Sequence, residues 1–186
     1  MTNHSPAPAL DLRIARWSRW LARACMALTF CLPLLVVGFW LLASDGNLLM
    51  RMGGLESRTL LAPLASWQRV AGALFSGAAL LPLLIGLGCA RRCFLRFGRG
   101  QVFSGGAVAD LQRFAFWIVV AAAASLINSV LMSVLLTLHN PPGARMLAIG
   151  ISTDQVLILF FAAVVWLMAA IIGQGQAIAD ENAAFV

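Results

Sequence analysis

Four long stretches without a charged side chain constrain this chain more than any other feature of its sequence. They cover residues 24–44, 70–90, 114–144 and 155–179, and they contain 21, 21, 31 and 25 residues. A helix needs about 20 apolar residues to cross the hydrocarbon core of a bilayer. Inside that core, a spanning segment must satisfy its own backbone amides. The pattern therefore predicts that each stretch forms a membrane-spanning helix.

The composition excludes most soluble classes of protein. Of the 186 residues, 61% are hydrophobic and 11% are charged, against about 45–50% and about 25% in soluble domains. So few charges cannot cover a water-facing surface, which excludes soluble globular domains, disulfide-rich secreted scaffolds, disordered chains and conventional DNA-binding domains. All 13 basic residues are arginine, which, with the abundance of alanine, leucine and glycine, is typical of a GC-rich bacterial genome.

We expect an all-α, polytopic membrane protein with four transmembrane helices in one bundle. The third stretch is too long for one span, and the sequence His139-Asn140-Pro141-Pro142-Gly143 breaks helices, so its helix ends near Leu138. The predicted spans are 24–44, 70–90, 114–138 and 155–178, within a transmembrane domain of residues 24–179. A cytoplasmic segment, 1–23, precedes this domain, and a short acidic tail, 180–186, follows it.

The arginines beside the spans predict the orientation. Nine lie on the side of the two termini and four on the other side. Because loops rich in arginine stay in the cytoplasm, we expect both termini there and the chain in a bacterial inner membrane. The nine are Arg13, Arg16, Arg19, Arg23, Arg91, Arg92, Arg96, Arg99 and Arg113, and the four are Arg51, Arg58, Arg69 and Arg145.

A short amphipathic helix is predicted before the first span, beginning at Leu10. Its apolar side chains share one face, and its arginines share another. Such a helix with tryptophans suits the headgroup region of an anionic leaflet. The arginines could equally serve only to set the topology.

The predicted inner loop, residues 91–113, carries the candidate partner surface. Its arginines extend the second helix into the cytoplasm, and Gly98 and Gly100 end that helix. Ser104 is well placed to cap the third helix, and Asp110 lies near its start, where an acid favours the helix dipole. The acidic tail emerges on the same side, so ion pairs between tail and loop are a hypothesis. The candidate surface consists of Arg91, Arg92, Arg96, Arg99, Gly100, Val102, Phe103, Ser104, Asp110, Asp180 and Glu181.

Three short motifs carry a resemblance to a known family. They are Phe97-Gly98-Arg99-Gly100-Gln101-Val102-Phe103-Ser104, Asp110-Leu111-Gln112-Arg113 and Ala179-Asp180-Glu181-Asn182. Together they resemble the bacterial membrane proteins grouped as Domain of Unknown Function 2975, which are similar in size and have four predicted spans. The resemblance covers the chain roughly from the first span to the C-terminus and implies no established activity. Genes of this family often lie beside a small helix-turn-helix regulator, which implies a membrane partner that holds or inhibits a transcription factor.

The leading hypothesis is a regulatory or scaffolding membrane partner of a cytoplasmic protein such as a helix-turn-helix regulator. An acidic patch on that protein would dock on the basic loop. We expect no enzymatic centre, cofactor, metal site or direct nucleic-acid binding. The bilayer is the expected environment, and a homo-oligomer is compatible with the sequence.

A translocator of small molecules or ions is the first alternative. Polar side chains at helical spacing form a stripe on the third helix, with a glutamine on the fourth. The favoured interpretation is that the stripe joins helices by hydrogen bonds. The spans also lack the ionisable residue that ion coupling usually requires. The stripe comprises Ser125, Asn128, Ser129, Ser133 and Gln174.

A membrane thiol redox protein is the second alternative, because the chain has four cysteines. All four fall toward the predicted cytoplasmic side, which is reducing, so small apolar packing residues are the favoured interpretation. His139, beside Asn140, could sense external pH, although a residue that merely ends a helix is favoured. The cysteines are Cys25, Cys31, Cys89 and Cys93.

Overall fold

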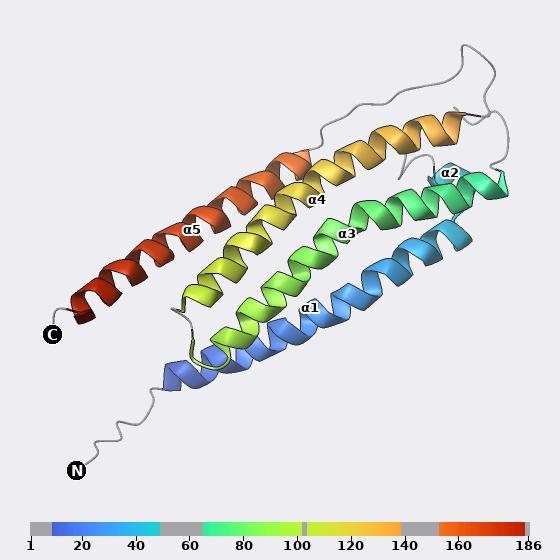
Figure 1. Cartoon of the computed structure of the whole chain (residues 1–186). Helices are drawn as coiled ribbons and strands as arrows, with labels where there is room; N and C mark the ends of the chain where they lie inside the picture. The colour runs from blue at the N-terminus through green and yellow to red at the C-terminus, as the bar shows by residue number, and fades with distance from the viewer. Residues whose placement is uncertain (1–8, 49–64, 102–103, 139–152, 185–186) are drawn as a thin grey trace. The chain divides into compact units, whose positions relative to one another are not determined.

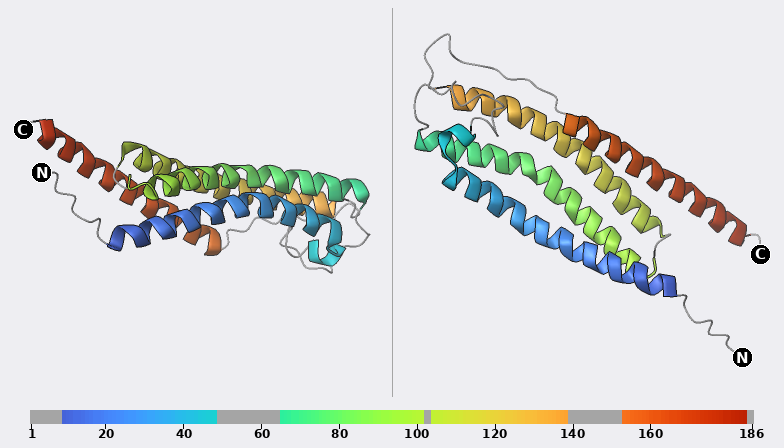
Figure 2. Two further views of the ribbon diagram at one scale, coloured as in Figure 1. Left: turned by 90° about the horizontal axis from the view of Figure 1, so that it is seen from below. Right: turned by 180° about the vertical axis from the view of Figure 1, so that it is seen from behind.

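The structure is a computed structural model that describes residues 9–48, 65–101, 104–138 and 153–184. Within these ranges the chain forms five helices and no strand (Figures 1 and 2). The helices are α1 (Ala9–Leu42), α2 (Asp45–Leu48), α3 (Ser66–Phe97), α4 (Gly105–Thr137) and α5 (Thr153–Ala184).

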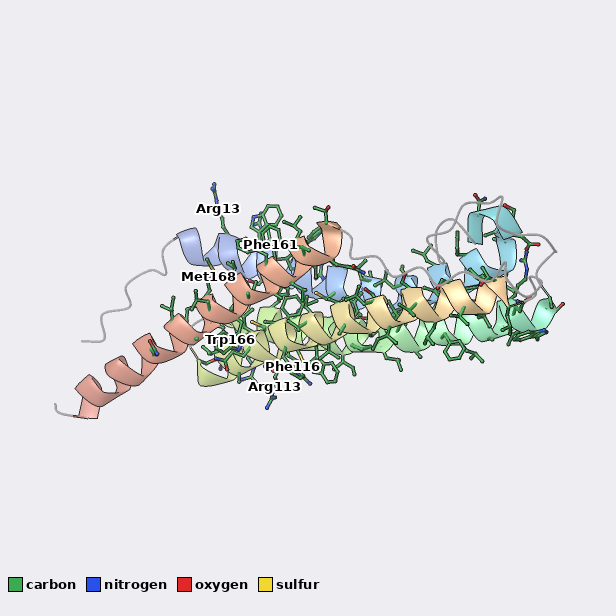
Figure 3. The ribbon with its side chains drawn as sticks, turned by 90° about the horizontal axis from the view of Figure 1, so that it is seen from above. Arg13, Arg113, Phe116, Phe161, Trp166 and Met168 are labelled. Carbon is green, nitrogen blue, oxygen red and sulfur yellow. The ribbon has the colours of Figure 1, made fainter. Side chains whose placement is uncertain are left out.

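Four of these helices are long and apolar enough to cross a membrane. Large apolar side chains project from these helices and are more than half exposed: Phe116, Phe161 and Met168 are 60, 57 and 58% exposed (Figure 3). Lipid tails solvate such side chains, whereas water does not. The predicted all-α fold with four spanning helices is therefore confirmed, and the chain is a multi-pass membrane protein. The apolar segments are Ala15–Leu42, Ser66–Phe97, Gly105–Thr137 and Gln155–Gly175.

The long helices extend beyond the hydrocarbon core. With 32 residues, α3 is about 48 Å long, against a core of about 30 Å. The helix expected from Leu10 is present and continues into the first span without a break, so that α1 has 34 residues. The described arginines that flank the charge-free stretches therefore lie on helical turns: Arg23, Arg69, Arg91 and Arg113.

The turn between α3 and α4 has the predicted end signals. Gly100 has a φ of 79°, and the N–H groups of Gly100 and Gln101 donate to the carbonyls of Phe97 and Arg96, both at 3.0 Å. This pair of bonds is the Schellman motif that ends many helices. At the start of α4, the N–H of Ala107 donates to Ser104 Oγ at 3.3 Å. Both the glycine end of α3 and the Ser104 cap are confirmed.

The chain divides into two compact units, each described by itself. Unit 1 contains Met1–Thr29, Ile85–Trp117 and Phe161–Val186, and unit 2 contains Phe30–Leu84 and Ile118–Phe160. The boundary passes through the long helices, so each unit takes part of α1, α3, α4 and α5. Unit 1 holds the α3–α4 turn, and unit 2 holds α2.

The core of unit 2 forms around one tryptophan. Trp40 of α1 is 1% exposed and packs with Met132 and Leu136 of α4. Its indole Nε1 donates to Ser76 Oγ of α3 at 3.2 Å. A Cβ atom at Gly72 would overlap the indole ring. Because lipid does not drive helices together by the hydrophobic effect, such close approach and hydrogen bonding must hold them.

Buried and partly buried polar contacts strengthen the same unit. Gln68 is fully buried; its Nε2 donates to the Leu135 carbonyl of α4 at 2.8 Å, and its Oε1 accepts from the Ala65 N–H at 2.9 Å. Arg69 donates to the Trp40 carbonyl at 3.3 Å and forms an ion pair with Asp45. These contacts join α1, α3 and α4 where α3 begins.

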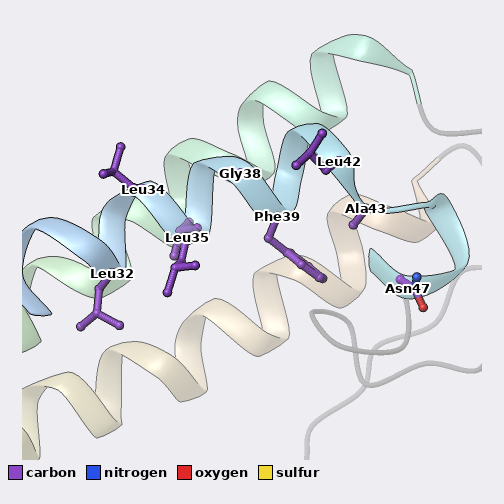
Figure 4. Close-up of a pocket in the computed structure, with 9 residues that line it drawn as sticks. Leu32, Leu34, Leu35, Gly38, Phe39, Leu42, Ala43 and Asn47 are labelled. Atoms are coloured by element: carbon purple, nitrogen blue, oxygen red, sulfur yellow. The ribbon is translucent and has the colours of Figure 1, made fainter.

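A large apolar hollow lies along α1 in unit 2, with a volume of about 700 Å³. Leu32, Leu35 and Phe39 project from the same side of α1 into this region, and Asn47 of α2 lies at one end (Figure 4). The other lining side chains are apolar. A surface of this kind suits acyl chains and offers little to a polar ligand.

We predict that Gly72→Ala destabilises the protein by about 2 kcal/mol, because overfilling a packed core forces side chains and backbone to shift. The melting temperature in detergent would fall. Gly77→Ala is the matched control: it lies on the same helix, and nothing lies within 4 Å of its added Cβ. Equal melting temperatures for the two variants would contradict the packing of Trp40 on Gly72.

Candidate functional site

Unit 1 gathers exposed arginines from α1, α3 and α4. Arg13 and Arg113 point away from their helices (Figure 3), and Arg96 is half-buried. The concentration of positive charge predicted for this part of the chain is therefore present on its surface. The exposed arginines are Arg13, Arg16, Arg19, Arg23, Arg91, Arg92, Arg99 and Arg113.

One buried acid organises two of the neighbouring arginines. Asp110, in the second turn of α4, is 3% exposed. Its Oδ2 accepts a hydrogen bond from Arg96 Nε at 3.1 Å, and its Oδ1 lies 3.5 Å from Arg92 Nε. Burying a lone carboxylate is costly, and paired guanidiniums offset that cost. The three residues thus fasten the end of α3 to the start of α4.

Small residues let the two helices come close at this cluster. A Cβ atom at Gly106 would overlap the guanidinium of Arg96, so Arg96 lies directly over the first turn of α4. Cys93 is 1% exposed, and its thiol donates to the Ala107 carbonyl at 3.7 Å. Arg92 Nη2 donates to Cys89 Sγ at 3.2 Å. Cys89 and Cys93 are free thiols, and both are buried packing residues here.

The structure divides the predicted partner surface. Arg91, Arg92, Arg99 and Gly100 are exposed, whereas Asp110 is buried. The Asp110 carboxylate is covered and already bound by two guanidiniums, so it does not add to the exposed part of this surface. The position of Asp110 near the helix start predicts a favourable interaction with the helix dipole, and the structure adds its ion pairs with Arg92 and Arg96.

Four residues of that surface stay as predictions. Val102 and Phe103 lie outside the described residues. Asp180 and Glu181 belong to α5, but their side chains also lie outside the described part of the chain. The ion pairs between tail and loop therefore stay a prediction.

Two serines of the polar stripe on α4 donate hydrogen bonds to carbonyls of their own helix. Ser125 Oγ donates to the Ala122 carbonyl at 3.0 Å, and Ser133 Oγ donates to the Val130 carbonyl at 2.8 Å. Gln155 of α5 donates to Ser125 Oγ at 3.4 Å, which joins two helices of unit 2.

The remaining members of the stripe differ from one another. Ser129 and Asn128 are half-buried, and the buried Oδ1 of Asn128 accepts no hydrogen bond in the described structure. Gln174 is exposed and belongs to unit 1, whereas the other four residues belong to unit 2. His139 lies outside the described residues. Within the described ranges, no group of three or more His, Cys, Asp or Glu side chains could hold a metal ion.

The fold and its charged surface define a class: a helical multi-pass membrane protein whose exposed arginines, among the described residues, lie in the unit that contains both chain ends. The chain belongs to the family described as "Protein of unknown function (DUF2975)", whose model matches residues 54–186, well over half of the chain. That match includes all three motifs on which the resemblance was based, so the family assignment is confirmed. No curated protein and no solved structure matches the chain.

We predict that Asp110→Asn destabilises the protein by about 2 kcal/mol, because two guanidiniums lose a charged, buried acceptor. Thermal unfolding in detergent would show the loss. Asp45→Asn is the control, because its ion pair with Arg69 is partly exposed on both sides and contributes about 1 kcal/mol or less. An Asp110→Asn protein as stable as the Asp45→Asn protein would contradict the fastening role.

Proposed function

We propose that the chain is a regulatory or scaffolding protein of the bacterial inner membrane that docks a cytoplasmic protein. The docking site is the turn between α3 and α4, with Arg99, Gly100 and Gln101 at its exposed tip. The observation that supports the proposal is that an exposed arginine lies on a turn with a fixed conformation. The Schellman bonds and the Asp110 ion pairs hold the end of α3 and the start of α4 in place.

Charge determines the class of surface that fits this tip. Asp110 binds Arg92 and Arg96, whereas Arg99 has no ion pair among the described side chains. An exposed guanidinium on a fixed turn, with no counterion among the described side chains, favours an acidic patch on the partner, because complementary charge speeds association and selects partners. Arg92, which is 57% exposed at its side chain, adds to the same positive potential.

The orientation and the partner class rest on the sequence. Nine arginines against four support cytoplasmic termini and a cytoplasmic α3–α4 turn. The family resemblance supports a helix-turn-helix regulator as the partner. The proposal assigns no catalytic activity, cofactor or direct nucleic-acid contact to the chain, and it is compatible with a homo-oligomer.

Photo-crosslinking from position 101 tests the docking site. A photoreactive residue replacing Gln101 in intact cells should crosslink to a soluble protein with an acidic surface. Arg99→Glu should weaken binding of that purified partner to the reconstituted full chain by about tenfold or more, because like charges would then meet. Arg13→Glu, an exposed arginine on α1, is the matched control.

A charge swap makes the test specific. Replacing an acid of the partner with arginine should restore its binding to the Arg99→Glu protein. Crosslinks from position 101 to lipids alone would overturn the proposal. Equal partner binding by wild type and Arg99→Glu would overturn it as well.

A translocator is the second candidate, and Asn128 is the observation that favours it. Its Oδ1 is buried and accepts no hydrogen bond in the described structure. A buried amide oxygen without a donor is costly, and a passing solute or ion could supply the missing partner. Ser125, one turn away, already donates to its own helix and accepts from Gln155.

Flux measurements test this candidate. Proteoliposomes would be assayed for K⁺, Na⁺ and proton flux with ion-sensitive dyes. A translocator would exceed empty liposomes, and Asn128→Leu would abolish the excess while Ser125→Ala retained it. Flux equal to that of empty liposomes would exclude these three ions as its cargo.

A further inference from the structure

A small groove in unit 1 combines three arginines with an apolar wall. It lies between α1 and α3 and has a volume of about 200 Å³. The two helices approach closely there, because a Cβ atom at Gly98 would lie 3.3 Å from Arg19 Cγ. The lining consists of Arg19, Ala22, Arg23, Met26, Arg91 and Leu95.

Two of these arginines stand at the edge of the charge-free stretches. Arg23 is the charged residue directly before residues 24–44, and Arg91 is the one directly after residues 70–90. Because the hydrocarbon core excludes charge, the core should end near these two side chains. Arg19 lies one turn further along α1. The groove therefore opens at the level of the lipid phosphates, and α1 and α3 supply its charges together.

The positive charge of the groove is not balanced within the described side chains. Asp110 is the acid of unit 1 whose side chain the structure describes, and it pairs with Arg92 and Arg96. Arg19 donates from Nε to the Ala15 carbonyl at 3.2 Å, which leaves its terminal nitrogens for another acceptor. Three clustered guanidiniums create a strong local potential for an anion, and their planar, forked donors suit phosphate oxygens.

The rest of the lining favours a lipid over a free anion. Ala22, Met26 and Leu95 form an apolar wall beside the arginines, and Met26 is 48% exposed. Trp17 and Trp20, 65 and 60% exposed and in edge-to-face contact, lie on the adjoining turns of α1. Exposed tryptophans of this kind are typical of the membrane interface. An anionic headgroup attached to an acyl chain fits the arginines, the apolar wall and the interfacial tryptophans together.

We propose that this groove is a binding site for one anionic phospholipid. The phosphate lies between Arg19, Arg23 and Arg91, and the glycerol and upper acyl chain lie along Ala22, Met26 and Leu95. The site is separate from the tip at Arg99, so it does not depend on the docking of a soluble partner. Bound lipid would join α1 to α3, which share no ion pair in the described part of unit 1.

Native mass spectrometry of the full chain in detergent tests the site. The probes are phosphatidylglycerol and phosphatidylcholine with identical acyl chains. The wild type should retain one phosphatidylglycerol in preference to phosphatidylcholine, and Arg23→Gln with Arg91→Gln should weaken that binding by about tenfold. The matched control pair, Arg13→Gln with Arg113→Gln, removes the same charge from exposed positions outside the groove and should keep the preference.

A second variant separates a specific site from loss of folding. Met26→Trp fills the apolar part of the groove and keeps every arginine, so it should also lower phosphatidylglycerol binding. An equal loss of binding in the control pair would overturn the proposal, because attraction would then be diffuse. Competition by inorganic phosphate at the same concentration as the lipid would also overturn it, since the ligand would be a free anion.

Discussion

The exclusion of charge from the bilayer core is the constraint on which the rest of this structure depends. It keeps the charged residues of unit 1 outside the four charge-free stretches and leaves the helices to associate without a hydrophobic driving force. Unit 2 shows how they do so. Trp40 packs on the bare backbone of Gly72 and binds Ser76, and Gln68 reaches the Leu135 carbonyl. Close backbone approach and buried hydrogen bonds thus add to the apolar packing of Trp40 on Met132 and Leu136.

In unit 1 the same constraint concentrates the arginines, and the neighbours of each one give it a different environment. Arg92 and Arg96 bind Asp110, Arg99 lies exposed beside the turn glycine, and Arg91 faces α1 across a groove. Residues 91–99 look like a single basic run in the sequence. In three dimensions the run divides into a structural ion-pair cluster, an exposed tip and one wall of a pocket, so its charges are not interchangeable.

Local signals predicted the helices and the turn, because they act within a few residues. The charge-free stretches predicted the spans, Gly100 predicted the end of α3, and Ser104 predicted the cap of α4. The Asp110 cluster was not predicted, because its ion pairs join residues that lie 14 and 18 positions apart in the sequence. These pairs depend on how α3 and α4 align across the turn, which no local sequence signal gives. A signal existed: Arg92 and Arg96 share a helix face, and Asp110 is the one acid between residues 57 and 153. The groove depends on the packing of α1 against α3 and has no local signal.

The three positions of the Asp110 cluster should also differ in how well they tolerate substitution. Losing either guanidinium leaves the carboxylate with one counterion. A substitution at one arginine is therefore partly compensated by the other arginine. Losing the carboxylate removes the shared acceptor at once, and no second acid within the described part of the hairpin can substitute. Natural sequences should accordingly vary more at Arg92 and Arg96 than at Asp110.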